Sequence, residues 1–146
     1  MPAAVPIDEG LRLKREAIVR DHMEAENRLD TEAAIATFTR PRYELIGTHR
    51  VYDGIDEVRQ YFRESRSIFP DQHNELIALH HADDAVVVEF WLRGTHKGDF
   101  RGVPPTGKSL ESKMAAFFLF EEDRLVCERV YFDAATILTQ LGFVGG

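Results

Sequence analysis

Cysteine is nearly absent from this chain of 146 residues, which contains only Cys127. One thiol cannot form an intramolecular disulfide, and such sparse usage is typical of proteins that fold in a reducing compartment. Long apolar runs are also missing, because the longest, residues 114–120, is far too short to cross a bilayer as a helix. We therefore expect a cytoplasmic protein with no membrane partner.

Clusters of lysine and arginine are lacking as well. The chain carries 18 basic and 25 acidic residues, a formal net charge of −7. Without a basic face it offers no electrostatic footprint for phosphate groups, which argues against nucleic acid and anionic membranes as partners. Residues 1–6 have neither the basic start nor the apolar stretch of a signal peptide. We expect residues 1–8 to form a loose lead into a single domain over residues 1–146.

What the chain does contain is a pattern of helices followed by strands. Apolar residues recur three, four or seven apart in residues 8–28, and residues 30–38 and 55–69 predict two further helices. Residues 43–46 and 49–52 predict a short hairpin. Longer strands are predicted over residues 74–81, 85–96, 110–120 and 125–133, before a final turn or helix over 134–141. This order predicts an α+β fold with helices packed on one face of a curved sheet.

Alternation along the strands predicts which side chains face inward. In residues 85–96 the even-numbered positions are apolar as far as residue 92, and His96 is in phase with them. The opposite face, which includes Trp91, is mixed and suits a dimer interface with a polar rim. In the last strand neither face is cleanly apolar, and we expect the face with Cys127, Tyr131 and Asp133 to lie inside.

The most specific pattern is a loop rich in glycine and proline. Residues 94–107 read G-T-H-K-G-D-F-R-G-V-P-P-T-G, and Asp133 precedes the sequence Q-L-G at residues 140–142. Residues 94–142 resemble, nearly position by position, polyketide cyclases of the SnoaL type, in the nuclear-transport-factor-2-like and ketosteroid-isomerase-like superfamily. The resemblance implies a cone-shaped fold in which about three N-terminal helices and a curved, mainly antiparallel sheet enclose a pocket. It also implies a homodimer formed through the outer face of the sheet.

The resemblance implies a catalytic role for Asp133. In the family, the aspartate ahead of Q-L-G is the acid/base group of an intramolecular aldol ring closure. A carboxyl group in an apolar pocket suits this role because desolvation raises its pKa toward neutrality. Two other roles stay open: Asp133 could cap the final helix, or it could form an ion pair with Arg129 that keeps it ionised.

Two histidines are further catalytic candidates. His96 could relay a proton to a substrate carbonyl, or it could simply order the loop around Pro104 and Pro105. His22 lies in a helix similar to the first helix of ketosteroid isomerases, at the place of their oxyanion-binding tyrosine. It could replace that donor, or it could be a histidine packed on a helix face.

The walls of the expected pocket are apolar. We predict that Phe90, Met114, Phe118 and Tyr131 contact the substrate. By the same resemblance to ketosteroid isomerases, the places of the two carboxyl groups that steroid isomerisation uses hold Ile46 and Ala116, so this reaction is not expected.

Neither a metal nor an organic cofactor is expected. Adjacent strand residues such as His80 and His81 point to opposite faces and cannot chelate together. The six histidines show no spaced carboxylate partner that would indicate a metal site.

The sequence thus predicts acid/base catalysis on a small apolar carbonyl compound, with a polyketide-type cyclisation as the nearest named reaction. Two alternatives stay open. One is a related epoxide hydrolase or isomerase, and the other is a non-catalytic module for small-ligand binding or dimerisation.

Overall fold

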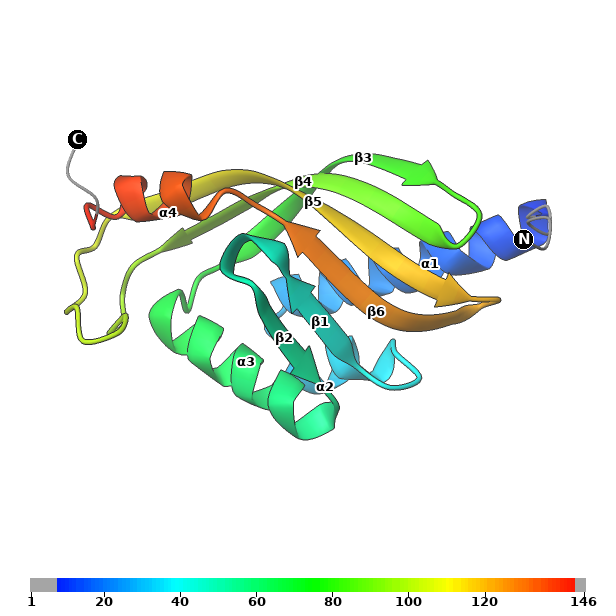
Figure 1. The fold of residues 1–146 in the computed structure, drawn as a ribbon, viewed down its shortest axis with the longest axis horizontal. Coiled ribbons are helices and arrows are strands. Elements are labelled where there is room, and N and C mark those ends of the chain that lie inside the picture. The colour runs from blue at the N-terminus through cyan, green and yellow to red at the C-terminus, as the bar shows by residue number, and fades with distance from the viewer. Residues whose placement is uncertain (1–7, 144–146) are drawn as a thin grey trace.

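The computed structural model describes residues 8–143 and has the predicted order of elements (Figure 1). The elements are α1 (Glu9–Asn27), α2 (Thr31–Ala36), β1 (Arg42–Leu45), β2 (Arg50–Asp53), α3 (Ile55–Ile68), β3 (His73–His81), β4 (Ala85–Thr95), β5 (Ser109–Glu121), β6 (Arg124–Tyr131) and α4 (Ala134–Gln140). A short 3-10 turn, Ile46–Thr48, joins β1 to β2. Within the described residues, none of the helices has both the length and the apolar character that crossing a membrane would take.

Aspartate side chains begin three of the helices. Asp8 accepts a hydrogen bond from the backbone N–H of Leu11 at 2.7 Å, and Asp30 accepts one from Ala33 at 3.1 Å. These bonds satisfy backbone donors that a helix leaves unpaired at its first turn. Asp133 caps α4 in the same way. Local sequence therefore accounts for where these helices start.

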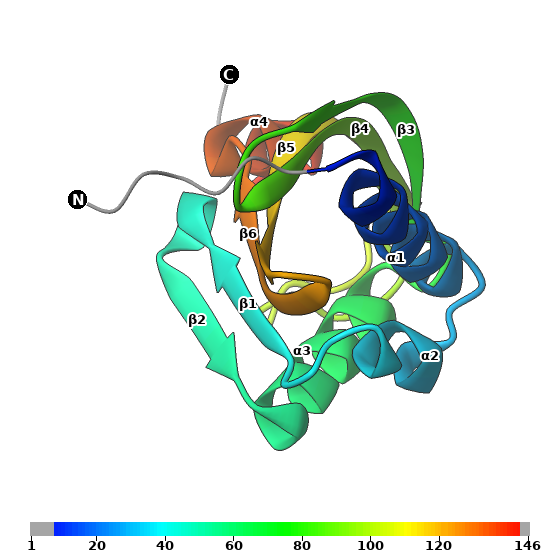
Figure 2. The same ribbon diagram turned by 90° about the vertical axis from the view of Figure 1, so that its right-hand side faces the viewer.

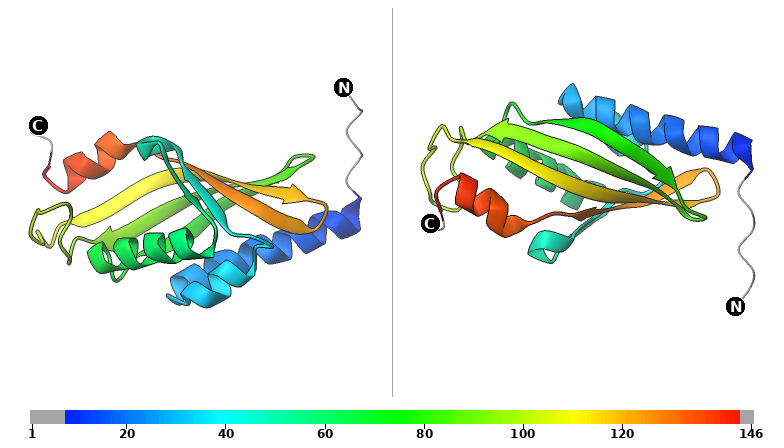
Figure 3. Two further views of the ribbon diagram at one scale, coloured as in Figure 1. Left: turned by 60° about the horizontal axis from the view of Figure 1, so that its bottom comes forward. Right: turned by 90° about the horizontal axis from the view of Figure 1, so that it is seen from above.

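The six strands form one mixed, curved sheet in the order β2-β1-β6-β5-β4-β3. The pair β1 and β6 is parallel, and all other neighbours are antiparallel. Figures 2 and 3 show α1, α2 and α3 on the same side of this sheet, inside its curvature. The predicted architecture of helices on one face of a curved sheet is confirmed.

The core fills the space between the helices and the concave face of the sheet. The predicted inward face of β4 is confirmed, because Val86, Val88 and Phe90 are all buried. The strand β5 alternates cleanly along its length, with buried residues at every even position from 110 to 120. Val19 of α1 and Val58 of α3 close the core from the helix side, each with no exposed surface.

The strand β6 differs from the predicted alternation, because a β-bulge interrupts its pairing with β5. Leu119 of β5 pairs with Cys127, but the next residue, Phe120, pairs with Leu125, so β6 has one extra residue at this point. A bulge moves all following side chains to the other face. Glu128 therefore lies on the concave side, opposite Phe118.

The predicted inward face of Cys127, Tyr131 and Asp133 is consequently wrong. Cys127 is buried but pairs with a residue of the outer face. Tyr131 is 42% exposed and Asp133 is exposed too.

Candidate functional site

The three predicted catalytic residues lie at three separate places. Asp133 is exposed and caps α4, accepting hydrogen bonds from the backbone N–H of Ala135 at 3.0 Å and the hydroxyl of Thr136 at 2.8 Å. The hydrogen bonds from Thr136 are the main cause that lowers the pKa of Asp133. It borders an open groove of about 430 Å³ on the outer side of the sheet, which Lys113 and Tyr131 also line. Asp133 is thus an ionised, exposed helix cap. The expected catalytic carboxyl group would instead be buried in an apolar pocket.

His96 anchors the loop that follows β4. Its side chain is fully buried, and its Nδ1 atom accepts a hydrogen bond from the backbone N–H of Thr106 at 3.2 Å and lies 2.9 Å from the Thr106 hydroxyl. The ring of Phe143 packs edge-on against it. These contacts fit the second of the two roles considered for His96, in which it orders the loop. Nine residue steps, roughly 30 Å at the usual rise, separate this end of β4 from Val86, which pairs with Phe118 beside His22.

His22 is the centre of a buried polar cluster. Its Nε2 atom lies 2.7 Å from a carboxylate oxygen of Glu26, 2.9 Å from one of Glu128 and 2.8 Å from the hydroxyl of Tyr43. The side chain of His22 has no exposed surface, and Glu128 and Tyr43 are buried as well. A ring nitrogen carries at most one hydrogen, so these three oxygens compete for it. The cluster therefore has to share protons among its members.

The other ring nitrogen of His22 is held by α2 and the residue after it. Its Nδ1 atom lies 3.2 Å from the carbonyl oxygen of Ala34 and 2.9 Å from the hydroxyl of Thr37. The Thr37 hydroxyl donates its own hydrogen to the same carbonyl at 2.6 Å. Since a carbonyl only accepts, Nδ1 is the donor, and the ring is oriented with Nε2 toward the carboxylates.

Burial and charge both act on the protons of this cluster. Burial alone would lower the pKa of His22, but the charge of Glu26 and the close contacts with the carboxylates of Glu128 and Glu26 outweigh it and raise the pKa from 6.5 to about 10. Burial, and then the charge of Glu26, raise the pKa of Glu128 above its ordinary value. Burial likewise raises the pKa of Tyr43. The cluster therefore retains protons near neutral pH, as acid/base sites do.

Aromatic side chains surround the cluster. The rings of Phe38 and Phe118 lie edge-on to His22, at 5.3 and 5.4 Å between ring centres. Of the predicted substrate contacts, Phe118 is thus beside the cluster, and Phe90 and Met114 are buried in the core. Tyr131 lies on the outer face and packs against Phe117.

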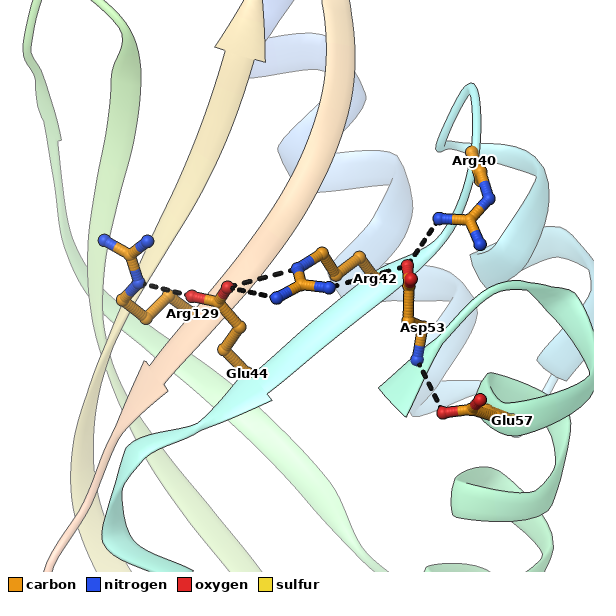
Figure 4. Close-up of polar contacts among 6 residues, drawn as sticks. All are labelled: Arg40, Arg42, Glu44, Asp53, Glu57 and Arg129. Atoms are coloured by element: carbon orange, nitrogen blue, oxygen red, sulfur yellow. Dashed lines mark hydrogen bonds and ion pairs between the residues drawn. The ribbon is translucent and has the colours of Figure 1, made fainter. Parts of the chain in front are cut away.

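A ladder of opposite charges on the outer face holds β1 against β6 (Figure 4). The guanidinium of Arg129 donates to Glu44 at 2.6 Å, and Arg42 binds the other oxygen of the same carboxylate at 3.0 Å. Glu44 and Arg129 are partners in the parallel pairing, and so are the preceding residues Tyr43 and Glu128, which lie inside. The ladder therefore sets the register that brings Tyr43 to Glu128. It also means that Arg129 pairs with Glu44 and not with Asp133.

Sequence reasoning overlooked Glu26, Tyr43 and Glu128. A signal existed for Glu26, because it follows His22 by four residues in a helix, a spacing that places both on one face. No such signal existed for Glu128, because the bulge that turns it inward leaves no mark in the alternation of β6.

Comparison with known proteins gives a family model and a set of solved structures. The model of the SnoaL-like polyketide cyclases matches residues 16–141. No curated protein matches the chain.

Three solved structures illustrate the likeness. A proposed SnoaL-like polyketide cyclase from Jannaschia sp. CCS1 is 17% identical, with 97% of this chain and 100% of that chain covered and a TM-score of 0.83. IdmH, a proposed polyketide cyclase from Streptomyces antibioticus, is 26% identical over 88% of this chain and 98% of that chain, with a TM-score of 0.74. A Catenulispora acidiphila protein with a ketosteroid isomerase-like fold is 16% identical over 87% and 93%, with a TM-score of 0.73. These similarities confirm the predicted fold.

Proposed function

Because the chain belongs to the SnoaL-like polyketide cyclase family, we propose that it is an acid/base enzyme acting on a small, largely apolar carbonyl compound. The nearest reaction is an aldol ring closure of the polyketide-cyclase type, without a cofactor. Such a reaction removes a proton from the carbon next to one carbonyl and delivers a proton to the oxygen of the carbonyl that is attacked.

The buried cluster around His22 carries this proposal. Its position supports the assignment, since the resemblance of the first helix to that of ketosteroid isomerases implies that His22 takes the place of their oxyanion-binding tyrosine. Its chemistry supports it too, because Glu128 and His22 are 2.9 Å apart, the carboxylates raise the pKa of His22 against the effect of burial, and burial raises the pKa of Glu128. Asp133 has the position of the family's acid/base aspartate, but it is exposed and its pKa is lowered, so we assign the acid/base role to the buried cluster.

The proposed cycle moves one proton in each direction. The ionised carboxylate of Glu128 takes the proton from the substrate carbon while the new carbon–carbon bond forms. The protonated Nε2 of His22 donates its hydrogen to the oxygen of the attacked carbonyl, and the phenol of Tyr43 donates a hydrogen bond to the same developing charge. Glu128 then returns its proton to His22, which restores the starting state without net uptake of protons.

The described residues support the two alternative functions, an epoxide hydrolase and a non-catalytic module, to different degrees. An epoxide hydrolase of this fold needs an Asp–Arg–Asp set, but Arg129 is engaged by Glu44 and Asp133 caps α4. A non-catalytic binding or dimerisation module is favoured by one observation, the complete burial of His22. The following experiment separates this module from the enzyme.

Exchange of carbon-bound protons with D₂O tests the first half of the cycle, because it needs only the base. We would follow it by NMR with a panel of small cyclic ketones and β-keto esters. Glu128→Gln should slow the exchange by roughly two to four orders of magnitude, the usual scale for a general base. Asp133→Asn keeps a cap of equal quality and should exchange like the wild type. Exchange lost in Asp133→Asn but kept in Glu128→Gln would move the site to the outer groove, and no exchange by the wild type would favour the binding module.

A further inference from the structure

The same cluster has the donor set of a cation site. We propose that His22, Glu26 and Glu128 bind one divalent transition-metal ion, with Zn²⁺ the best match and the hydroxyl of Tyr43 beside the ion. This goes beyond the proposed function, which uses the cluster without a metal. It concerns a property that the protein would show in the absence of any substrate.

The geometry needs little change to accept an ion. The ligand atoms of His22, Glu26 and Glu128 all lie within 4.8 Å of one another. Around a tetrahedral Zn²⁺ with bonds of about 2.0–2.1 Å, neighbouring ligand atoms are about 3.3 Å apart. The distances from Nε2 of His22 to Glu26 and Glu128 are 2.7 and 2.9 Å. Each oxygen therefore has to move outward by only about half an ångström, within the reach of a side-chain rotation.

The hydrogen bonds behind the imidazole are those of a metal-binding histidine. Such a histidine donates its second ring N–H to a carbonyl or carboxylate, which fixes the tautomer and directs the bare nitrogen at the ion. In His22 the Nδ1–H points to the carbonyl oxygen of Ala34 and the hydroxyl of Thr37. The lone pair of Nε2 then faces the two carboxylates without further adjustment.

Charge balance favours a cation at this place. Two carboxylates share a single imidazole, and among residues 8–143 no lysine or arginine forms a salt bridge with either of them. Arg66 comes close to Glu26 but donates to its backbone carbonyl at 3.1 Å. One imidazole offsets at most one of the two negative charges, whereas a divalent ion would neutralise both.

Glu128 gives an independent indication of a missing partner. It is 5% exposed, and its Oε1 atom is buried and lacks a hydrogen bond within the described part of the chain. This is so although Oε1 lies 2.9 Å from Nε2 of His22, because proximity alone does not align a donor with it. An ion bound at Nε2 of His22 would therefore be the partner that Oε1 lacks.

The types of ligand favour zinc, and the partial exposure of one of them allows the ion to enter. His22 and Glu26 share one face of α1, and Glu128 is on β6, between β1 and β5. Imidazole with carboxylates suits Zn²⁺, whereas Ca²⁺ and Mg²⁺ prefer oxygen ligands alone. The side chain of Glu26 is 18% exposed and connects the cluster to solvent. An ion on Nε2 and a proton on Nε2 exclude each other, so the metal-bound form cannot donate that proton.

Calorimetric titration of untagged, EDTA-stripped and dialysed protein with ZnCl₂ tests the proposal. We expect one ion per chain, with binding weakened at least roughly tenfold in both Glu26→Gln and Glu128→Gln. CaCl₂ should give no binding. Glu26→Gln changes a partly exposed side chain, and circular dichroism would verify that this variant folds. X-ray absorption of the zinc-loaded protein should report nitrogen and oxygen ligands without sulfur.

A second histidine provides the matched control. His81 lies 2.7 Å from Glu16 in a partly buried pair outside the cluster and could bind zinc by itself. His81→Gln should leave the affinity unchanged. The proposal is overturned if the wild type does not bind Zn²⁺, or if binding survives both glutamate substitutions or disappears in His81→Gln. Proton exchange measured in EDTA tests the proposed enzyme separately, so either proposal can fail alone.

Discussion

At the scale of single residues, His22 should make the stability of the protein depend on pH. Its pKa is raised from 6.5 to about 10 because the two carboxylates outweigh burial. A histidine with a raised pKa stabilises the folded state fully below its unfolded pKa, and this contribution is lost as the pH rises through the folded value. The relevant window is therefore about pH 6.5 to 10.

Urea unfolding at pH 7 and pH 9.5 measures this effect. The wild type should lose on the order of 2–3 kcal/mol of unfolding free energy across this window because of His22. His22→Gln keeps a hydrogen-bonding side chain but cannot titrate, so it should lack this loss. Parallel pH profiles for the two proteins would contradict the assigned protonation of the cluster.

Asp133 should act on local order and not on the chemistry. Its carboxylate satisfies the first backbone donors of α4. In Asp133→Ala the amides of Ala135 and Thr136 should exchange with solvent several-fold faster, whereas Asp133→Asn should protect them like the wild type. Hydrogen exchange followed by NMR measures both, and equal protection in the alanine variant would argue against the cap.

Between elements, the loop after β4 depends on a close backbone approach at Gly98. A Cβ atom at this position would lie 1.7 Å from the carbonyl oxygen of Ser67, at the end of α3. The N–H groups of Lys97 and Gly98 also donate to the carbonyl of Ile68, at 3.0 and 3.2 Å. Any side chain at Gly98 thus has to push the loop off the helix.

Gly98→Ala should therefore destabilise the protein by about 1–3 kcal/mol, as forced backbone shifts usually do. Gly102→Ala is the matched control, because a Cβ there meets nothing within 4 Å. It should cost no more than about 1 kcal/mol, from its positive φ. Urea unfolding compares the two, and equal costs would show that the contact with α3 is unimportant.

At the level of elements, the sequence was sufficient wherever local chemistry decides the outcome. The apolar spacing of α1 and α3, the aspartate that caps α2 and the alternation of β4 all predict what the structure contains. Each depends on residues that are close together along the chain. The loop rich in glycine and proline, residues 94–107, also indicates the family to which the chain belongs, and the members of that family share this fold.

The site could not be predicted in the same way, because it depends on contacts between distant segments. His22 was identified as a candidate, but Glu128 comes to it from 106 positions further along the chain. One extra residue in β6 decides whether Glu128 or Cys127 faces inward, and both faces of this strand contain buried residues. The same bulge made Tyr131 look like a pocket residue.

For the whole molecule, the outer face of the sheet is the predicted dimer interface. Partly buried apolar side chains gather there on β4 and β5, among them Trp91, Phe117 and Leu119. Ala115→Arg would place a charge in the middle of this face and should convert a dimer to a monomer. Sedimentation velocity measures the change, with Glu24→Arg on the exposed side of α1 as the control. A monomeric wild type would contradict the interface.

The order of the sheet has a consequence for how the protein is made. The strand β6 lies between β1 and β5, yet it is the last of the six strands to leave the ribosome. Until then the β1–β2 hairpin has no neighbour in the sheet, and His22 lacks one of its two carboxylates. The nascent chain can form helices and the β3–β4–β5 meander early, but it has to keep an edge open for insertion. This edge, exposed during synthesis, is the place where a chaperone would bind.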